Sequence, residues 1–187
     1  MSERYGDLTV GGFLDALAAR SPAPSGGAAA AVTVASAAAL TAMAARFAGS
    51  AELTGLAGPA DVLRARLLEL ADADGPAYAQ VLAASRLPAS APDRAARMAA
   101  AFRTATEVPL AVARAGVEVA ELAARLVAEG NANLVGDSRV AVLLAEAGVR
   151  AAAELVGINV RHGELDGAPL ADARACVRTA EAFARPH

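Results

Sequence analysis

The chain has 187 residues and a formal net charge of −3, and hydrophobic residues make up 56% of it but aromatic residues only 3%. This length suffices for one domain with a sizeable core, and the abundance of alanine and leucine over strand-forming residues favours helices. The 17 basic residues, all arginines, form no basic block, which argues against nucleic-acid binding. We therefore expect an all-α fold whose core of small side chains is partly covered by a second subunit.

Cysteine and histidine are too scarce for several kinds of site. Cys176 is the only cysteine, so we expect no intrachain disulfide, and a reducing cytoplasm fits. His162 and His187 stand far apart in the chain, so we expect no histidine-rich metal site. The segment Met1–Val10 has no apolar signal core. These residues predict a cytoplasmic protein without a bound metal.

The first two predicted helices flank the turn SPAPSGG. Thr9 can cap the first helix, which ends before Ser21. The second runs from about Gly26 to Ala48, and it is apolar or small on every face because no charge occurs between Ser25 and Arg46. Its length would suit a membrane span. Its alanine-rich composition, the lack of an aromatic belt and the lack of a second such run favour a buried helix at the centre of a bundle.

Two longer helices follow, and each contains a proline. Gly49 to Pro59 should form a turn, after which a third helix reaches Arg86 with a kink expected at Gly75-Pro76. The turn LPASAPDR leads into a fourth helix. Pro109 in its interior predicts a kink or a break near Thr106 to Val108.

The last two predicted helices complete the bundle. Asp137 or Ser138 can cap a fifth helix, which ends near His162, and a short helix from Asp166 reaches about Ala184. No linker or repeat divides the chain. We expect one helical domain over residues 1–187, a single antiparallel bundle of about six helices.

Three polar clusters interrupt this apolar pattern, and the first is the glycine corner Ser25-Gly26-Gly27. Free N–H groups and the positive end of the dipole at a helix start suit an anion or a polar ring edge. The corner is neither a P-loop nor a dinucleotide fingerprint. A plain turn before a tight helix crossing explains the same residues.

The second cluster is the acidic pair in LADADGPAY. Asp72 and Asp74 are two residues apart on a helix, so at most one of them can face inward. Asp74 and Tyr78 are four apart and share a face. An inward carboxylate would suit general acid/base work or a cationic substrate, whereas a carboxylate in solvent just before Pro76 needs no function.

The third cluster is the loop GNANLVGDS. Asn131 and Asp137 could hydrogen-bond a ligand at the end of the bundle, although a helix stop followed by a cap accounts for the same residues. Asn159 lies in the apolar stretch LVGINV and needs a partner if it is buried. That partner could belong to the protein or to a ligand.

Five segments, in this order, resemble the cyclodeaminase/cyclohydrolase family. This family includes the C-terminal half of formiminotransferase-cyclodeaminase and the small methenyltetrahydrofolate cyclohydrolases of the serine-cycle type. The segments are FLDALAARSPAPSGGAAAA, LLELADADGPAYAQVLAASRLP, TEVPLAVA, EGNANLVGDSRVAVLLAEA and GINV. The chain departs from the family pattern at four positions. They are Ser25 in place of glycine, Ala28 and Gly136 in place of serine, and Leu155 in place of asparagine.

The resemblance implies an all-helical homodimer that binds a folate between helices without a metal or nucleotide cofactor. Its expected reaction is hydrolysis of 5,10-methenyltetrahydrofolate to 10-formyltetrahydrofolate, in which a carboxylate orients or deprotonates the attacking water. The glycine corner would hold the pterin or the glutamate tail, and the amides would fix the ring. The predicted site residues are Asp74 and Asp137 for catalysis, and Ser25, Gly26, Gly27, Tyr78, Asn131 and Asn159 for substrate binding.

Three alternatives remain at this point. The chain could be a formiminotetrahydrofolate cyclodeaminase, which closes the 5-formimino group to methenyl with loss of ammonia, although no formiminotransferase half accompanies it. It could also be a folate-binding relative without activity. The third alternative is a helical interaction protein whose alanine-rich faces bind partner helices.

Overall fold

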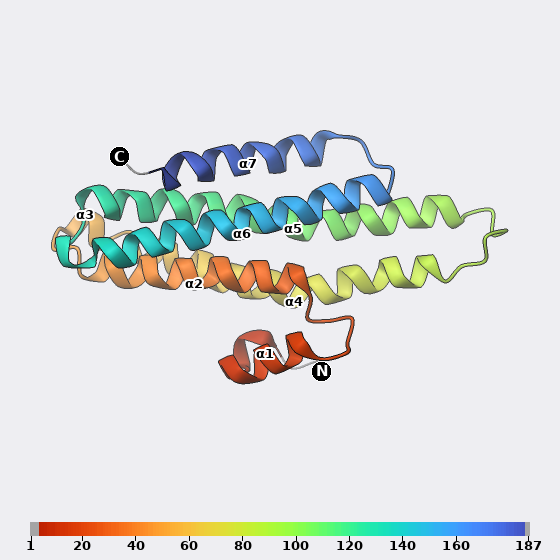
Figure 1. Cartoon of the computed structure of the whole chain (residues 1–187), viewed down its shortest axis with the longest axis horizontal. Helices are drawn as coiled ribbons and strands as arrows, with labels where there is room; N and C mark the ends of the chain where they lie inside the picture. Colours follow the sequence, from red (N-terminus) through yellow and green to blue (C-terminus); the bar gives the residue numbers. More distant parts are fainter. Residues whose placement is uncertain (1–3, 186–187) are drawn as a thin grey trace.

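The structure is a computed structural model that describes residues 4–185. Four long antiparallel helices form a bundle, and a fifth packs against two of them (Figure 1). The bundle helices are α2 (Gly26–Arg46), α4 (Ala57–Ser85), α5 (Arg94–Glu129) and α6 (Val135–His162), and α7 (Ala168–Ala184) lies along α5 and α6. The shorter elements are η1 (Tyr5–Asp7), α1 (Val10–Ala18), α3 (Ala51–Thr54) and η2 (Ala132–Leu134).

The predicted all-α bundle is confirmed. Between residues 4 and 185 the structure has six helices of more than two turns and no strand. The predicted cap of α1 is also present, because the Thr9 hydroxyl accepts a hydrogen bond from the Gly12 N–H at 3.0 Å.

The central position of α2 depends on its small side chains. Twelve of its 21 residues are buried, most of them alanine, and it packs against α4, α5 and α6. A Cβ on Gly148 of α6 would lie 2.3 Å from a methyl group of Val34, so the two helices meet at a distance that only glycine permits. By length and composition α2 could cross a membrane, but 61% of its apolar window is buried inside the bundle. The predicted buried central helix is confirmed.

Three local predictions need correction, and the first is the break that was one of the two outcomes predicted at Pro109. The helix α5 continues through Pro109 without a break. Proline has no N–H, so the carbonyl of Ala105 loses its usual helical partner. The side-chain amide of Asn159 on α6 donates to this carbonyl instead, at 2.8 Å. The predicted continuation of α4 through Pro76 to Arg86 is confirmed, since this helix ends at Ser85 with Arg86 as its C-cap.

The other two corrections concern helix starts. The predicted turn between Gly49 and Pro59 contains α3 and the start of α4, because Ser50 caps α3 by accepting from the Leu53 N–H at 3.2 Å, and Leu53 is buried. Asp137 and Ser138 do not cap α6. This helix begins at Val135 directly after η2, so Asp137 lies in its first turn and Ser138 is buried. The one-turn helix η2 before α6 moves the N-cap from the predicted Asp137 or Ser138 to Leu134, three or four residues earlier.

Candidate active site

A pocket of about 330 Å³ opens where α2 begins, between the middle of α4, the middle of α5 and the C-terminal half of α6. Figure 1 shows α4 and α5 continuing past the start of α2, where the chain turns toward α1. Ligand pockets commonly measure about 300–1,000 Å³. Six of the eight predicted site residues line this one. The lining residues are Ser25, Gly26, Gly27, Asp74, Ala77, Tyr78, Ala105, Pro109, Leu155, Ile158 and Asn159.

Asp74 is the acidic residue of this pocket. Its carboxylate reaches from α4 to the first turn of α2, where the Ser25 hydroxyl donates to Oδ2 at 2.7 Å. A Cβ on Gly27 would lie 1.9 Å from Oδ1, so the carboxylate occupies the space that a side chain at this position would fill. The positive end of the α2 dipole favours a negative charge there. The Asp74 carboxylate therefore occupies the anion site that the sequence predicts at the glycine corner.

Asp72 belongs to a different set of contacts. It accepts hydrogen bonds from the Tyr5 backbone N–H at 2.7 Å and from the Arg4 guanidinium at 3.3 Å. It thereby ties the N-terminal segment to α4. Burial raises the pKa of the Tyr5 phenol, and the nearby carboxylates of Asp72 and Asp74 raise it further. Only Asp74 of the acidic pair faces the pocket, as the spacing predicted.

The opposite wall of the pocket comes from α5 and α6. Leu155, Ile158 and Pro109 make it apolar, and Asn159 is its amide. The Nδ2 group of Asn159 is engaged by the Ala105 carbonyl, which can only accept, so Oδ1 remains as the free acceptor of this side chain. Tyr78 lies opposite on α4 with 42% of its surface exposed. The site thus combines one fixed carboxylate with mostly apolar walls.

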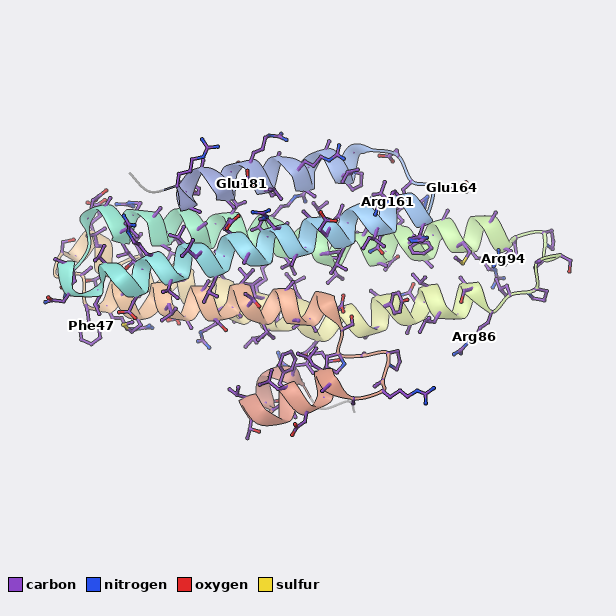
Figure 2. The ribbon with its side chains drawn as sticks, viewed as in Figure 1. Phe47, Arg86, Arg94, Arg161, Glu164 and Glu181 are labelled. Atoms are coloured by element: carbon purple, nitrogen blue, oxygen red, sulfur yellow. The ribbon has the colours of Figure 1, made fainter. Side chains whose placement is uncertain are left out.

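Asn131 and Asp137 lie outside this pocket. Asn131 precedes η2, where it accepts from the Asn133 N–H at 3.0 Å and donates to the Phe47 carbonyl at 3.1 Å. Figure 2 shows Phe47 at the end of the molecule opposite to the α4–α5 turn. Asp137 is about 27 Å from Leu155 along the axis of α6. Within one chain these two residues do not meet the other six.

The sequence did not reveal the apolar half of the wall. Ala77, Ala105 and Ile158 carry no chemical signal. Of the apolar lining residues, the sequence singled out only Pro109, as a mid-helix proline, and Leu155, as a departure from the family pattern. Among residues 4–185, no group of three or more His, Cys, Asp or Glu side chains could hold a metal ion.

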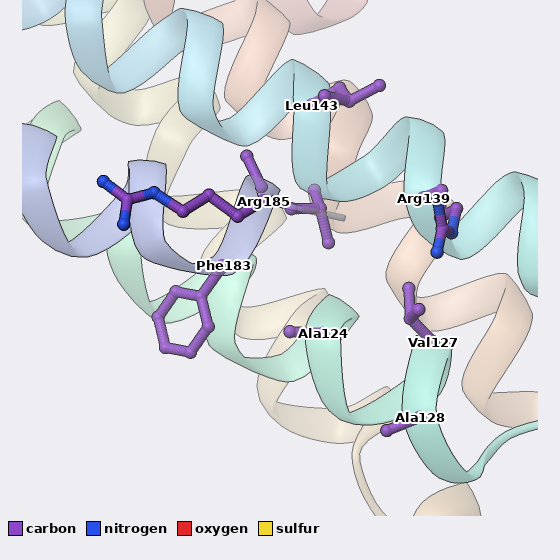
Figure 3. Close-up of a pocket in the computed structure, with 9 residues that line it drawn as sticks. Ala124, Val127, Ala128, Arg139, Leu143, Phe183 and Arg185 are labelled. Carbon is purple, nitrogen blue, oxygen red and sulfur yellow. The ribbon is translucent and has the colours of Figure 1, made fainter. Parts of the chain in front are cut away.

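A second pocket of about 330 Å³ lies between α5, α6 and the end of α7 (Figure 3). Its floor is apolar and includes Ala124, Val127 and Ala128, while Arg139 and Arg185 lie at its edge. None of the predicted site residues lines it, so the first pocket remains the candidate active site.

Comparison with known proteins gives consistent results. The family model described as formiminotransferase-cyclodeaminase matches residues 9–177. A methenyltetrahydrofolate cyclohydrolase from Methylorubrum extorquens is 37% identical over 168 residues, which cover 83% of this chain and 81% of that protein. The formimidoyltransferase-cyclodeaminase of Mus musculus is 32% identical over 167 residues, which cover 83% of this chain but 31% of the mouse protein.

A solved structure shares both the fold and part of the sequence. The crystal structure of formiminotetrahydrofolate cyclodeaminase from Thermotoga maritima superposes with a TM-score of 0.80 at 26% identity, covering 95% of this chain and 96% of that one. The family match spans most of the chain, and the relatives agree with it. The chain therefore belongs to the formiminotransferase-cyclodeaminase family.

Proposed function

We propose that this chain hydrolyses 5,10-methenyltetrahydrofolate to 10-formyltetrahydrofolate. The 37% identical relative of similar length bears the name of this activity, which supports the choice. The observation that carries the proposal is the carboxylate of Asp74, held by Ser25 at the edge of an otherwise mostly apolar pocket. The methenyl bridge is a delocalised cation, and a carboxylate in such surroundings attracts it.

In this mechanism a water molecule attacks the bridging carbon while Asp74 orients it and takes one of its protons. The resulting tetrahedral carbon then releases N5, which receives a proton. The formyl group remains on N10, and one proton leaves to solvent, so charge balances. The backbone of Ser25, Gly26 and Gly27 would lie against the pterin or the glutamate tail. Water and these protein groups suffice for a hydrolysis, so we propose no resident metal or cofactor.

The remaining ring contacts come from two side chains. Asn159 Oδ1 can accept from an N–H of the pterin, and Tyr78 lies where it can cover the ring at the entrance. We place the reaction in the cytoplasm, which agrees with the free thiol of Cys176.

We also propose that the active form is a homodimer. The side of α2 that faces away from the bundle carries no charge from Ala29 to Met43. The neighbouring α6 continues this face with an apolar stripe at helical spacing, and the two helices lie side by side in Figure 1. The stripe residues, exposed or half-buried, are Val140, Leu144, Ala147, Ala151, Leu155 and Ile158. A contiguous face of this kind is typical of a subunit interface.

Such a dimer gives Asp137 and Asn131 a role. Asp137 is on the same face of α6 as the stripe, and the stretch from Asp137 to Ile158 is centred near Ala147. A two-fold axis at that point would pack the two α6 helices antiparallel. The partner's Asp137 would then lie beside the pocket, with the partner's Asn131 nearby. The complete site in this proposal contains residues of both subunits.

Formiminotetrahydrofolate cyclodeaminase is the second candidate function, favoured by the similarity to the Thermotoga structure of that name. It uses the same folate and the same bridging carbon, but closes the ring and releases ammonia. Supplying each substrate in turn distinguishes the two, because only the cyclodeaminase reaction consumes 5-formiminotetrahydrofolate and forms ammonia.

The test follows the absorbance of methenyltetrahydrofolate with purified protein and with Asp74→Asn. Loss of the general base or charge should lower kcat about 100-fold or more. Asp72→Asn is the matched control, since this residue lies two positions away and binds the N-terminal segment. It should retain wild-type activity within about threefold. Equal rates for Asp74→Asn and wild type would remove the proposed role, and folate binding without turnover would indicate a non-catalytic relative.

A further inference from the structure

The helix α5 has an unusual backbone group in its middle. Pro109 lies well inside α5, and its ring nitrogen carries no hydrogen. The carbonyl of Ala105, four residues earlier, therefore has no N–H donor from its own helix. Both residues line the candidate active site. An unpartnered backbone carbonyl in the wall of a half-buried pocket needs a donor from elsewhere.

Asn159 supplies that donor. Its Nδ2 lies 2.8 Å from the Ala105 oxygen, and this bond joins α6 to α5 across the pocket wall. A carbonyl oxygen only accepts, so the amide can have only one orientation, with nitrogen toward α5. Among residues 4–185, no donor contacts Oδ1 of Asn159. No buried side-chain oxygen in this part of the chain lacks a partner, so this oxygen is accessible from the pocket. It is therefore an open acceptor.

We propose that Pro109 is a positioning residue: by freeing the Ala105 carbonyl it holds Asn159 in the orientation that presents Oδ1 to an N–H of the bound ring. This inference rests on the proposed function for the identity of the ring. The chemistry selects a flat heterocycle with an N–H donor at its edge. Without Pro109, the amide would be free to rotate and offer its nitrogen to the same ring position, where two donors would oppose each other.

The test is Pro109→Ala, which restores an N–H at this position. The Ala105 carbonyl then turns back along the helix to accept the bond from residue 109, as in an uninterrupted helix. Asn159 loses its anchor. We expect KM for the folate to rise about five- to tenfold with kcat changed less, because one oriented hydrogen bond to substrate is weakened. Thermal stability should stay equal or rise, since alanine favours the helix interior.

A double-mutant cycle separates positioning from a change in pocket shape. Asn159→Ala should raise KM in the wild-type background, but should add little in the Pro109→Ala background, because the amide is already released. Additive effects of the two changes would overturn the proposal. Pro76→Ala is the matched control. It also removes a mid-helix proline, but no side-chain donor in residues 4–185 contacts the Asp72 carbonyl that it frees, so KM should not change.

Nuclear magnetic resonance of the free protein provides a readout that does not depend on folate activity. The side-chain NH₂ signals of Asn159, assigned by their loss in Asn159→Ala, should show protection from exchange in wild type and lose it in Pro109→Ala. Retained protection in Pro109→Ala would overturn the positioning role. A wild-type protein that shows this protection but does not bind folate by calorimetry would contradict the proposed function alone.

Discussion

Gly27 has no side chain, and the Asp74 carboxylate occupies the place where its Cβ would be. The 1.9 Å separation between that hypothetical Cβ and Oδ1 leaves no room for even a methyl group. Ser25, where the family pattern has a glycine, donates to the other carboxylate oxygen at 2.7 Å. A departure from the family pattern at residue 25 thus adds a polar contact at the site. Gly27 thus leaves space for the Asp74 carboxylate, and Ser25 holds it by a hydrogen bond.

We predict that Gly27→Ala displaces the Asp74 carboxylate into the pocket and breaks its hydrogen bond with Ser25, which should lower the free energy of unfolding by roughly 0.5–1.5 kcal/mol, the usual net contribution of one hydrogen bond. The displaced carboxylate should also slow hydrolysis of methenyltetrahydrofolate. Denaturant unfolding and the absorbance assay measure the two effects.

Gly26→Ala is the matched control for stability. It is the neighbouring glycine at the start of the same helix, and a Cβ there would meet nothing within 4 Å. It should raise the free energy of unfolding by about 0.4–1 kcal/mol, because alanine restricts the unfolded chain. Equal stability changes in the two variants would mean that Asp74 does not occupy the space beside Gly27.

At the scale of elements, α2 and α4 are joined at their far end by one ion pair. Arg46 at the end of α2 donates to Asp61 near the start of α4, and Arg64 lies on the other side of the same carboxylate. The hydrogen bond from Arg46 and the charges of both arginines lower the pKa of Asp61 below its ordinary value near 3.8. The folded state therefore favours the charged carboxylate more than the unfolded state does.

The sign of this shift predicts a pH dependence. Above pH 3.8 the pair contributes its full stabilisation, and this contribution disappears as the pH falls from 3.8 through the lower folded-state pKa. We expect Asp61→Asn to lower the melting temperature at pH 7. The difference from wild type should shrink below pH 3.8. If the difference in melting temperature stayed constant from pH 7 to pH 2.5, the lowered pKa of Asp61 would be contradicted. Arg46→Gln removes the partner of Asp61, so it should also lower the melting temperature at pH 7 and reduce its pH dependence.

The helices themselves could be predicted from the sequence because their signals are local. Alanine-rich composition, the cap at Thr9 and the turn at Ser21 are each read within a few residues, and all three appear in the structure. The error at Pro109 arose because a distant residue decides the outcome. Pro109 does not break α5, because Asn159, fifty residues later in the chain, satisfies the carbonyl that proline frees. No local pattern contains that information.

At the scale of the whole molecule, the same limit applies to the site. The sequence singled out eight polar or glycine residues, but it could not show which of them meet. Six line one pocket because α2, α4 and α6 bring them together. Asn131 and Asp137 lie toward the other end of α6, and a straight helix keeps them there. Only the three-dimensional arrangement of the helices reveals this division.

The proposed dimer would reunite the two groups, and complementation tests it. Asp74→Asn and Asp137→Asn homodimers should each be weakly active. If the partner's Asp137 serves the pocket, a mixed dimer has one pocket that lacks both carboxylates and one that retains both. Random exchange of subunits should therefore restore about a quarter of the wild-type sites. The absorbance assay on a mixture incubated long enough for exchange measures this recovery.

A dimer-breaking variant provides the control for this experiment. Ala147→Glu places a charge at the centre of the proposed contact, where two copies would face each other across the two-fold axis, so it should yield monomers by analytical ultracentrifugation. When Ala147→Glu is added to both the Asp74→Asn chain and the Asp137→Asn chain, their mixture should recover no activity, although each chain stays folded. Recovery that persists in monomers, or its absence in mixtures shown to contain mixed dimers, would mean that Asp137 does not act on the partner's pocket. Asp74 would then be the acidic residue that serves the reacting carbon, because Asp137 of the same chain lies in the first turn of α6, far from the part of this helix that lines the pocket.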